Sequence, residues 1–180
     1  MTTMHDSPDQ RNATPTGTSG SIVLKGFLGH TQQQQNWCWA AVCVTVTNYF
    51  STPSEWLRQC DVVNMAFQTK DCCMSPGRYD IPRSVQGALE RAGHLNRQIP
   101  GAADAMGGFA VIAHEVGTLR HPIAVRNRIS GGGDHVVVIC GLREQTQSLL
   151  VWNPTGYYLR TTLANWSHDL GDWTNTYLTT

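Results

Sequence analysis

The sequence predicts an α+β fold in which helices come first and an antiparallel sheet follows. Helical spacing dominates before Pro122, and short β-branched or aromatic runs separated by turn residues dominate after it. Such segregation of helices from strands is typical of α+β proteins. The 180 residues are 41% hydrophobic, which suffices for one domain made of two lobes around a shared core.

The first segment, residues 1–21, is polar and rich in Thr, Ser, Pro and Gly, and it predicts a disordered tail. It lacks the apolar run of a secretory signal peptide. We therefore expect either a cytoplasmic protein or one exported or translocated by a route that needs no such signal. Residues 21–27 predict a strand.

Residues 37–50 fit two patterns. Val42, Val44 and Val46 alternate with smaller residues, as they would in a half-buried strand. Val42, Val46 and Tyr49 also share one face of a helix. Local propensity slightly favours the strand, so other evidence has to decide.

The later elements are clearer. Three segments have helical spacing together with N-cap residues or a closing glycine, at residues 52–67, 80–93 and 107–120. Four short runs bounded by turn residues predict strands, at residues 122–129, 134–142, 148–154 and 172–180.

Charge and composition exclude several classes of function. The formal net charge is zero, whereas proteins that bind nucleic acid or membrane surfaces carry a basic excess. No apolar run approaches the length of a membrane span. We therefore expect neither nucleic acid nor a membrane as partner.

The six cysteines contain no CxxC pair, which argues against a zinc ribbon. If one thiol stays free for chemistry, five remain, so we expect at most two disulfides and require none. A zinc site built from Cys60, Cys72, Cys73 and a histidine is the minor alternative, because its ligand spacing is irregular.

Three residues have settings that suit covalent catalysis. Cys38 would lie in the first turn of a helix, where free N–H groups and the helix dipole favour a thiolate. His135 starts a strand after a glycine triplet, and Asn153 ends the next strand, where its carboxamide could orient an imidazole. Each residue alone is more often structural. Adjacent antiparallel strands would bring His135 and Asn153 together, and the combination with Cys38 is much harder to obtain by accident.

The motifs around these residues resemble those of papain-like cysteine peptidases of the compact bacterial type, such as C39-like and AvrRpt-type effector proteases. "QQQQNWCWAA" resembles the nucleophile motif of that family, "GDHVVVICGL" its histidine strand and "VWNP" its asparagine position. The resemblance implies one catalytic domain at residues 22–180. Its helical lobe would span about 30–120, and its β lobe about 121–180 plus the strand at 21–27. The segment after the nucleophile is a buried central helix in this family, which favours a helix at 37–50.

The resemblance also implies roles for single residues. Cys38 is the nucleophile, His135 its partner in a thiolate–imidazolium ion pair, and Asn153 orients the imidazole. Gln32, six residues before the cysteine, is expected to help hold the oxyanion, whereas the three glutamines that follow it are loop residues. The residues expected beside the substrate are Trp37, Trp39, Gly133 and Asp134. The alternative for the two tryptophans is a purely structural role in the hydrophobic core.

The implied function is hydrolysis of peptide or isopeptide bonds, in an enzyme that serves as a bacterial effector or toxin. Such an enzyme takes a protein or peptide substrate as partner, and we expect neither a cofactor nor a metal. An inhibitor or immunity protein would then be a further partner. Two alternatives stay open from the sequence. The same triad performs acyl transfer in transglutaminases, deamidases and cyclases, and a degenerate protease fold can act as a binding module.

Overall fold

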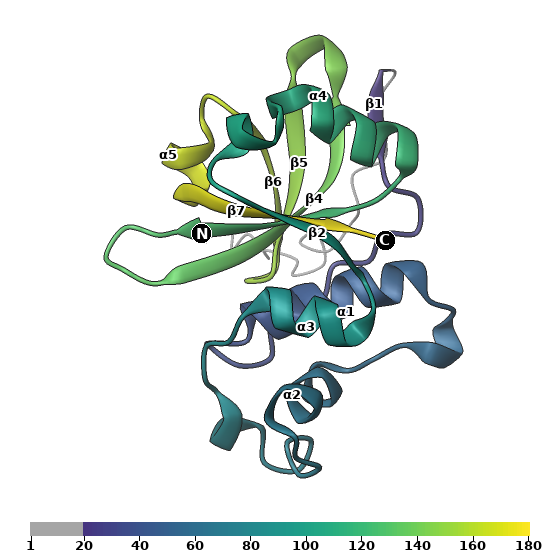
Figure 1. The fold of residues 1–180 in the computed structure, drawn as a ribbon, viewed down its shortest axis with the longest axis vertical. Coiled ribbons are helices and arrows are strands. Elements are labelled where there is room, and N and C mark those ends of the chain that lie inside the picture. Colours follow the sequence, from purple (N-terminus) through teal and green to yellow (C-terminus); the bar gives the residue numbers. More distant parts are fainter. Residues whose placement is uncertain (1–19) are drawn as a thin grey trace, which may run out of the picture.

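The computed structural model describes residues 20–180, in which a helical lobe lies against a sheet of seven strands (Figure 1). The tail predicted at residues 1–21 falls outside the described residues, apart from its last two. No described helix combines the length and the apolar character needed to cross a membrane.

The helical lobe consists of three helices, α1 (Cys38–Phe50), α2 (Gln59–Phe67) and α3 (Val85–Ala92). Helix α4 (Gly108–Ile112) continues into the π-helix η5 (Ala113–Leu119), and a single-turn helix α5 (Trp166–Leu170) precedes the last strand. Short 3₁₀ turns lie at η2 (Pro53–Glu55), η3 (Pro76–Tyr79), η4 (Ala103–Met106) and η6 (Glu144–Thr146).

The sheet is antiparallel throughout, in the order β2-β7-β3-β4-β5-β6, with β1 pairing with β4. Strand β3 pairs with the first part of β4, and β1 pairs with its last part, next to Gly141. A Cβ on Gly141 would lie 2.7 Å from the carbonyl oxygen of Ile22, so only glycine permits β1 to approach this closely. The strands are β1 (Ser21–Val23), β2 (Leu95–Pro100), β3 (Ile123–Arg128), β4 (Asp134–Arg143), β5 (Ser148–Asn153), β6 (Tyr157–Thr162) and β7 (Asp172–Thr179).

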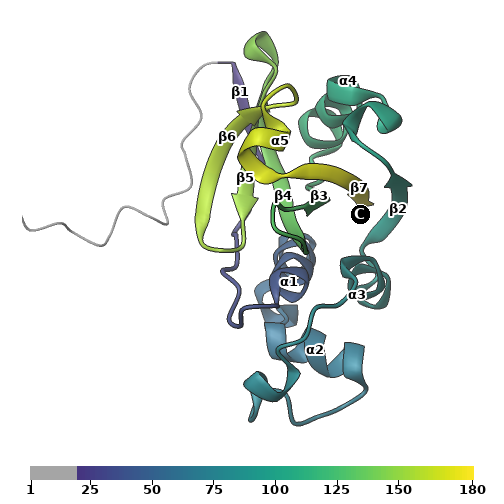
Figure 2. The same cartoon turned by 90° about the vertical axis from the view of Figure 1, so that its left-hand side faces the viewer.

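Helix α1 is the centre of the molecule. Figure 2 shows it between the sheet and the other helices of its lobe, α2 and α3. Every residue from 39 to 48 is buried. The helical alternative for residues 37–50 is therefore correct, and burial on all sides explains why its sequence lacks an amphipathic pattern.

The other helices and strands follow the sequence predictions with four differences. The helix predicted at 80–93 begins only at Val85, after the extended N-cap residue Ser84. The helix predicted at 52–67 is broken, because residues 56–58 lie between η2 and α2. The strand predicted at 21–27 ends at Val23. Three elements were missed, namely β2, β6 and α5.

The predicted boundary between the lobes also differs from the structure. Strand β2 belongs to the sheet, and α4 and η5 lie on the sheet side of the molecule, far from α2 (Figure 1). The helical lobe therefore ends near Gly93, whose left-handed conformation closes α3, instead of near residue 120.

Candidate active site

Cys38 is the first residue of α1 and is partly exposed. No side chain caps this helix, so its first N–H groups are left for other partners. Backbone N–H groups of Cys38, Trp39 and Val136 form hydrogen bonds with the sulfur. Because Val136 follows His135 in β4, the thiol lies beside the strand that bears the predicted histidine.

The free cysteines other than Cys38 are poor candidates for chemistry. All three are buried, and burial raises the pKa of the Cys43 thiol to about 12. Burial also raises the pKa of the Cys72 and Cys140 thiols. Within residues 20–180, Cys38 is thus the one free thiol with partial access to solvent.

His135 and Asn153 meet across the paired strands β4 and β5. The imidazole Nε2 lies 2.9 Å from the Asn153 Oδ1. The same oxygen accepts hydrogen bonds from the Thr155 backbone N–H (3.0 Å) and hydroxyl (2.9 Å). The Asn153 Nδ2 donates to the Tyr157 hydroxyl at 2.9 Å.

These contacts determine which nitrogen of His135 carries the proton. The Thr155 backbone N–H can only donate, so the carboxamide atom that faces the imidazole must be the oxygen of Asn153. Nε2 must then donate to it, and the neutral imidazole keeps a lone pair on Nδ1. This tautomer is suited to take a proton from a thiol.

Burial is the main cause of the pKa shifts of Cys38 and His135. Burial raises the pKa of the Cys38 thiol; the three backbone hydrogen bonds lower it, and the Asp134 carboxylate raises it further. Burial lowers the pKa of His135, against the opposite effect of the hydrogen bond to Asn153. Both shifts favour the neutral forms, a protonated thiol on Cys38 and an uncharged imidazole on His135. Desolvation therefore opposes the thiolate–imidazolium ion pair that the sequence predicts. That prediction considers only the N–H groups at the start of the helix and not the burial of the thiol.

Gln32 is held within its own loop. Its Nε2 donates to the carbonyls of Gln34 (3.0 Å) and Gln35 (2.7 Å), and its backbone N–H donates to Pro154 (2.7 Å). Its Oε1 is buried and accepts no hydrogen bond from the described residues. Because both side-chain N–H groups bind loop carbonyls, an oxyanion role requires one of them to turn toward the substrate.

Trp37 and Trp39 are core residues, which corrects their assignment to the substrate site. They are 0% and 1% exposed. Their indole N–H groups donate to the carbonyls of Tyr79 (2.8 Å) and Ile81 (3.2 Å). The two side chains therefore fasten the segment before α3 to the start of α1, and this fixes the backbone on both sides of Cys38.

Gly133 and Asp134 are exposed at the start of β4. Gly133 has φ +104°, a conformation that favours glycine, in the turn that leads to His135. The Asp134 carboxylate forms an ion pair with Arg126 and lies 4.0 Å from Arg128. Contact of either residue with a substrate remains a prediction.

A cavity of about 250 Å³ lies beside His135 and Asn153. Its walls are formed by Ile129 and Ser130 of the β3–β4 turn, by Tyr157, and by helix α5 together with Gly171. The wall includes Asp169, whose pKa is lowered by hydrogen bonds from Thr161 and His168, so its carboxylate is ionised. A larger cavity of about 430 Å³, between η4 and α5, contains none of the predicted site residues.

Thr155 and Tyr157 were missed by the sequence analysis. For Thr155 a signal existed, because an Asn side chain in "NPTG" commonly accepts the backbone N–H two residues later. Tyr157 had none, since its contact with Asn153 arises only when the β5–β6 turn brings the two side chains together.

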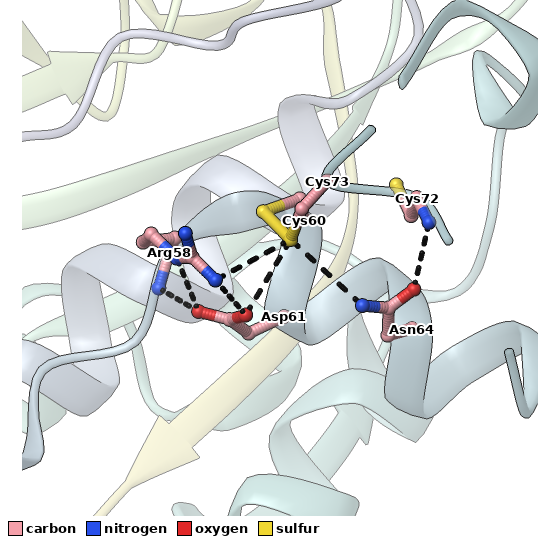
Figure 3. Close-up of polar contacts among 6 residues, drawn as sticks. All are labelled: Arg58, Cys60, Asp61, Asn64, Cys72 and Cys73. Atoms are coloured by element: carbon pink, nitrogen blue, oxygen red, sulfur yellow. Dashed lines mark hydrogen bonds and ion pairs between the residues drawn. A yellow bond between two sulfur atoms is a disulfide. The ribbon is translucent and has the colours of Figure 1, made fainter. Parts of the chain in front are cut away.

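A disulfide joins Cys60 in α2 to Cys73, within the limit of two that the sequence set. Figure 3 shows it beside the ion pair of Arg58 and Asp61, whose N–O distance is 2.8 Å. Cys60, Asp61 and Cys73 lie close enough together to surround a metal ion, but the two sulfurs are bonded to each other. The alternative zinc site at Cys60, Cys72 and Cys73 is therefore not formed in this structure.

Comparison with solved structures identifies the fold. The chain is similar to the peptidase domain of Streptococcus ComA, a bifunctional ABC transporter involved in a quorum-sensing pathway, with a TM-score of 0.54 and 13% identity over 83% of this chain and 96% of that one. The Pseudomonas avirulence protein AvrPphB matches at a TM-score of 0.40 and 11% identity, over 87% of this chain and 99% of that one. No protein-family model and no curated protein matches the sequence. The likeness to the ComA domain, together with a central helix packed on an antiparallel sheet, shows a papain-like peptidase fold.

Proposed function

We propose that the protein is a cysteine peptidase with Cys38 as nucleophile, His135 as base and Asn153 as the residue that orients the base. The observation that carries the proposal is the 2.9 Å contact between His135 Nε2 and Asn153 Oδ1, which leaves Nδ1 ready to accept a proton. The thiol of Cys38 lies next to the same strand, at the start of a buried helix.

The neutral pair suggests the order of proton movements. The Cys38 sulfur attacks the carbonyl carbon of the substrate while its proton passes to Nδ1 of His135. The tetrahedral oxyanion is held by the Cys38 backbone N–H and by Gln32, once a side-chain N–H turns from the loop. The C–N bond then breaks, and His135 returns the proton to the leaving amine. Water, deprotonated by His135, releases the acyl group and restores the thiol.

The cavity beside His135 fits the leaving-group side of the substrate. The imidazole has to reach the departing nitrogen, so the chain that follows the cleaved bond must run past His135. The ionised Asp169 and the apolar walls from Ile129 and Leu170 are suited to a side chain with an aliphatic stem and a positive end. An effector or toxin role, and an inhibitor or immunity protein as partner, are supported only by the resemblance of the Cys and His motifs.

A peptide library incubated in heavy-oxygen water tests the proposal. Wild-type protein should produce new C-termini that carry one heavy oxygen atom, and Cys38→Ala protein should produce none. Joined or cyclised peptides without heavy oxygen would indicate an acyl transferase instead. Unchanged peptides in both samples would contradict an enzymatic function and favour the binding module.

A further inference from the structure

We infer that Gln59 is a positioning residue for the reaction, an inference that rests on the proposed function. Gln59 is the first residue of α2, and although its side chain is polar it is only 3% exposed. Burial of a carboxamide is costly unless its donor and its acceptor are both paired. The hydrogen-bond partners of the Gln59 side chain therefore indicate its role.

Both ends of the Gln59 carboxamide bind the backbone of the glutamine loop. Its Oε1 accepts the Gln33 N–H at 2.9 Å, and its Nε2 donates to the Thr31 carbonyl at 2.7 Å. Thr31 and Gln33 are the two neighbours of Gln32. One side chain thus clamps the backbone on both sides of the residue proposed to hold the oxyanion.

Two further contacts relate this clamp to the reactive groups. The Gln32 backbone N–H donates a hydrogen bond to the carbonyl oxygen of Pro154, the residue after Asn153. The Gln34 carbonyl, which accepts a side-chain N–H of Gln32, also accepts the Trp37 N–H at 3.2 Å. Gln32 is therefore placed between the turn that carries Asn153 and the start of α1, and Gln59 supplies the support from the third side.

The base of the clamp is itself anchored. Cys60, next to Gln59, is bonded to Cys73, and Arg58 on the other side pairs with Asp61 (Figure 3). The carboxamide adds only the two bonds to the loop, so positioning of that loop is its specific contribution.

Two reactions of Cys38 distinguish a loss of oxyanion positioning from a general disturbance of the site. Acylation by p-nitrophenyl acetate passes through a tetrahedral oxyanion, whereas alkylation by iodoacetamide does not. Gln59→Met keeps the length of the side chain and removes both bonds. Since a shift of about 1 Å can cost about 100-fold in rate, we expect acylation to fall about 10- to 100-fold. Alkylation should stay within a few-fold of wild type.

A double-mutant cycle tests whether Gln59 acts through Gln32. In a Gln32→Ala background, Gln59→Met should change acylation little, because the group that it positions is already absent. The matched control is Asn64→Leu in the same helix. The Asn64 carboxamide accepts the Cys72 N–H at 3.0 Å and donates to the Cys73 sulfur at 3.8 Å. Neither bond involves the glutamine loop, and the disulfide stays in place in the variant, so acylation should be unchanged.

If Gln59→Met does not fold, Gln33→Pro removes one of the same bonds from an exposed position, with Gln33→Ala, which keeps the N–H, as its control. Wild-type acylation rates in Gln59→Met or in Gln33→Pro would overturn the inference. So would equal losses in acylation and alkylation, or losses that multiply with Gln32→Ala. A wild-type protein that p-nitrophenyl acetate does not acylate at Cys38 would overturn the proposed function, and the inference with it.

Discussion

Asn153 determines which nitrogen of His135, the proposed base, carries the proton. Its Oδ1 accepts three hydrogen bonds and its Nδ2 donates one, so the carboxamide cannot rotate without losing several partners. His135→Ala should lower kcat/KM about 100- to 10,000-fold, the range for removal of a general base. Asn153→Ala should cost less, because it only orients the ring.

The two losses should not add in the double variant, since both act on one imidazole. Peptidase kinetics of the two single variants and the double variant measure this. An Asn153→Ala enzyme with wild-type kcat/KM would show that another residue orients His135.

Gln32 differs from the three glutamines that follow it in both its contacts and its expected effect. Gln32→Ala should reduce kcat about 100- to 1,000-fold through loss of an oxyanion donor. It should also lower the free energy of unfolding by about 1–3 kcal/mol, because two hydrogen bonds to loop carbonyls disappear with it.

Alanine at Gln33, Gln34 or Gln35 keeps every backbone contact, so each variant should stay within a few-fold of wild type. Four single variants assayed for kcat, with denaturant unfolding of each, check this pattern. A large loss at one of the last three would move the oxyanion donor to that position. No loss at any of the four would leave the oxyanion to backbone N–H groups alone.

At the scale of the elements, a disulfide joins helix α2 to the loop that follows it. The Cys60–Cys73 disulfide closes a loop with a sequence separation of 13. The double variant Cys60→Ser, Cys73→Ser should therefore lose about 2–4 kcal/mol of stability under non-reducing conditions. Denaturant unfolding with and without a reductant measures it, and the reductant should remove most of the difference. Equal stability of the two proteins without reductant would mean that the bond does not form.

The elements that the sequence predicted are those whose burial produces a readable pattern. Strands β4 and β5 lie inside the sheet and contain buried apolar runs at residues 136–142 and 149–152, and β3, also inside the sheet, begins with a shorter one at 123–125. The missed strands β2 and β6 are at its two edges, where one side of the backbone is unpaired and polar residues are tolerated. Helix α5 has a single turn, too short to show a period.

The sequence predictions for the site divide in the same way. Motif spacing placed Cys38, His135 and Asn153 on the correct elements. Local composition could not separate a buried tryptophan from one that contacts substrate, so Trp37 and Trp39 were misassigned. Local composition also could not predict the desolvation of Cys38 and His135, because their burial depends on all the elements that pack around them.

At the scale of the whole molecule, the proposed pair of Cys38 in α1 and His135 in β4 is partly buried where this helix packs on the sheet. Its burial there raises the pKa of the Cys38 thiol and lowers the pKa of His135. Alkylation of Cys38 by iodoacetamide should therefore increase with pH up to values above the ordinary thiol pKa of about 8.5. The acid limb of kcat/KM should lie below about pH 6.5, because His135 must be neutral to accept the proton.

Alkylation rates measured over a pH series, with Cys38→Ala as the blank for the other cysteines, test the direction of both shifts. A rate that is already constant in mildly acidic solution would indicate a preformed thiolate–imidazolium pair. In that case the backbone N–H groups around the sulfur would outweigh its burial.

The central claim, that Cys38 is a nucleophile activated by His135, is tested most directly by trapping the acyl-enzyme. The protein is mixed with p-nitrophenyl acetate, quenched in acid, digested and analysed by mass spectrometry. We predict one acetyl group on Cys38 in wild type, formed at least about 100-fold more slowly in His135→Ala. Acetylation of another cysteine in preference to Cys38, or equal rates with and without His135, would contradict the account.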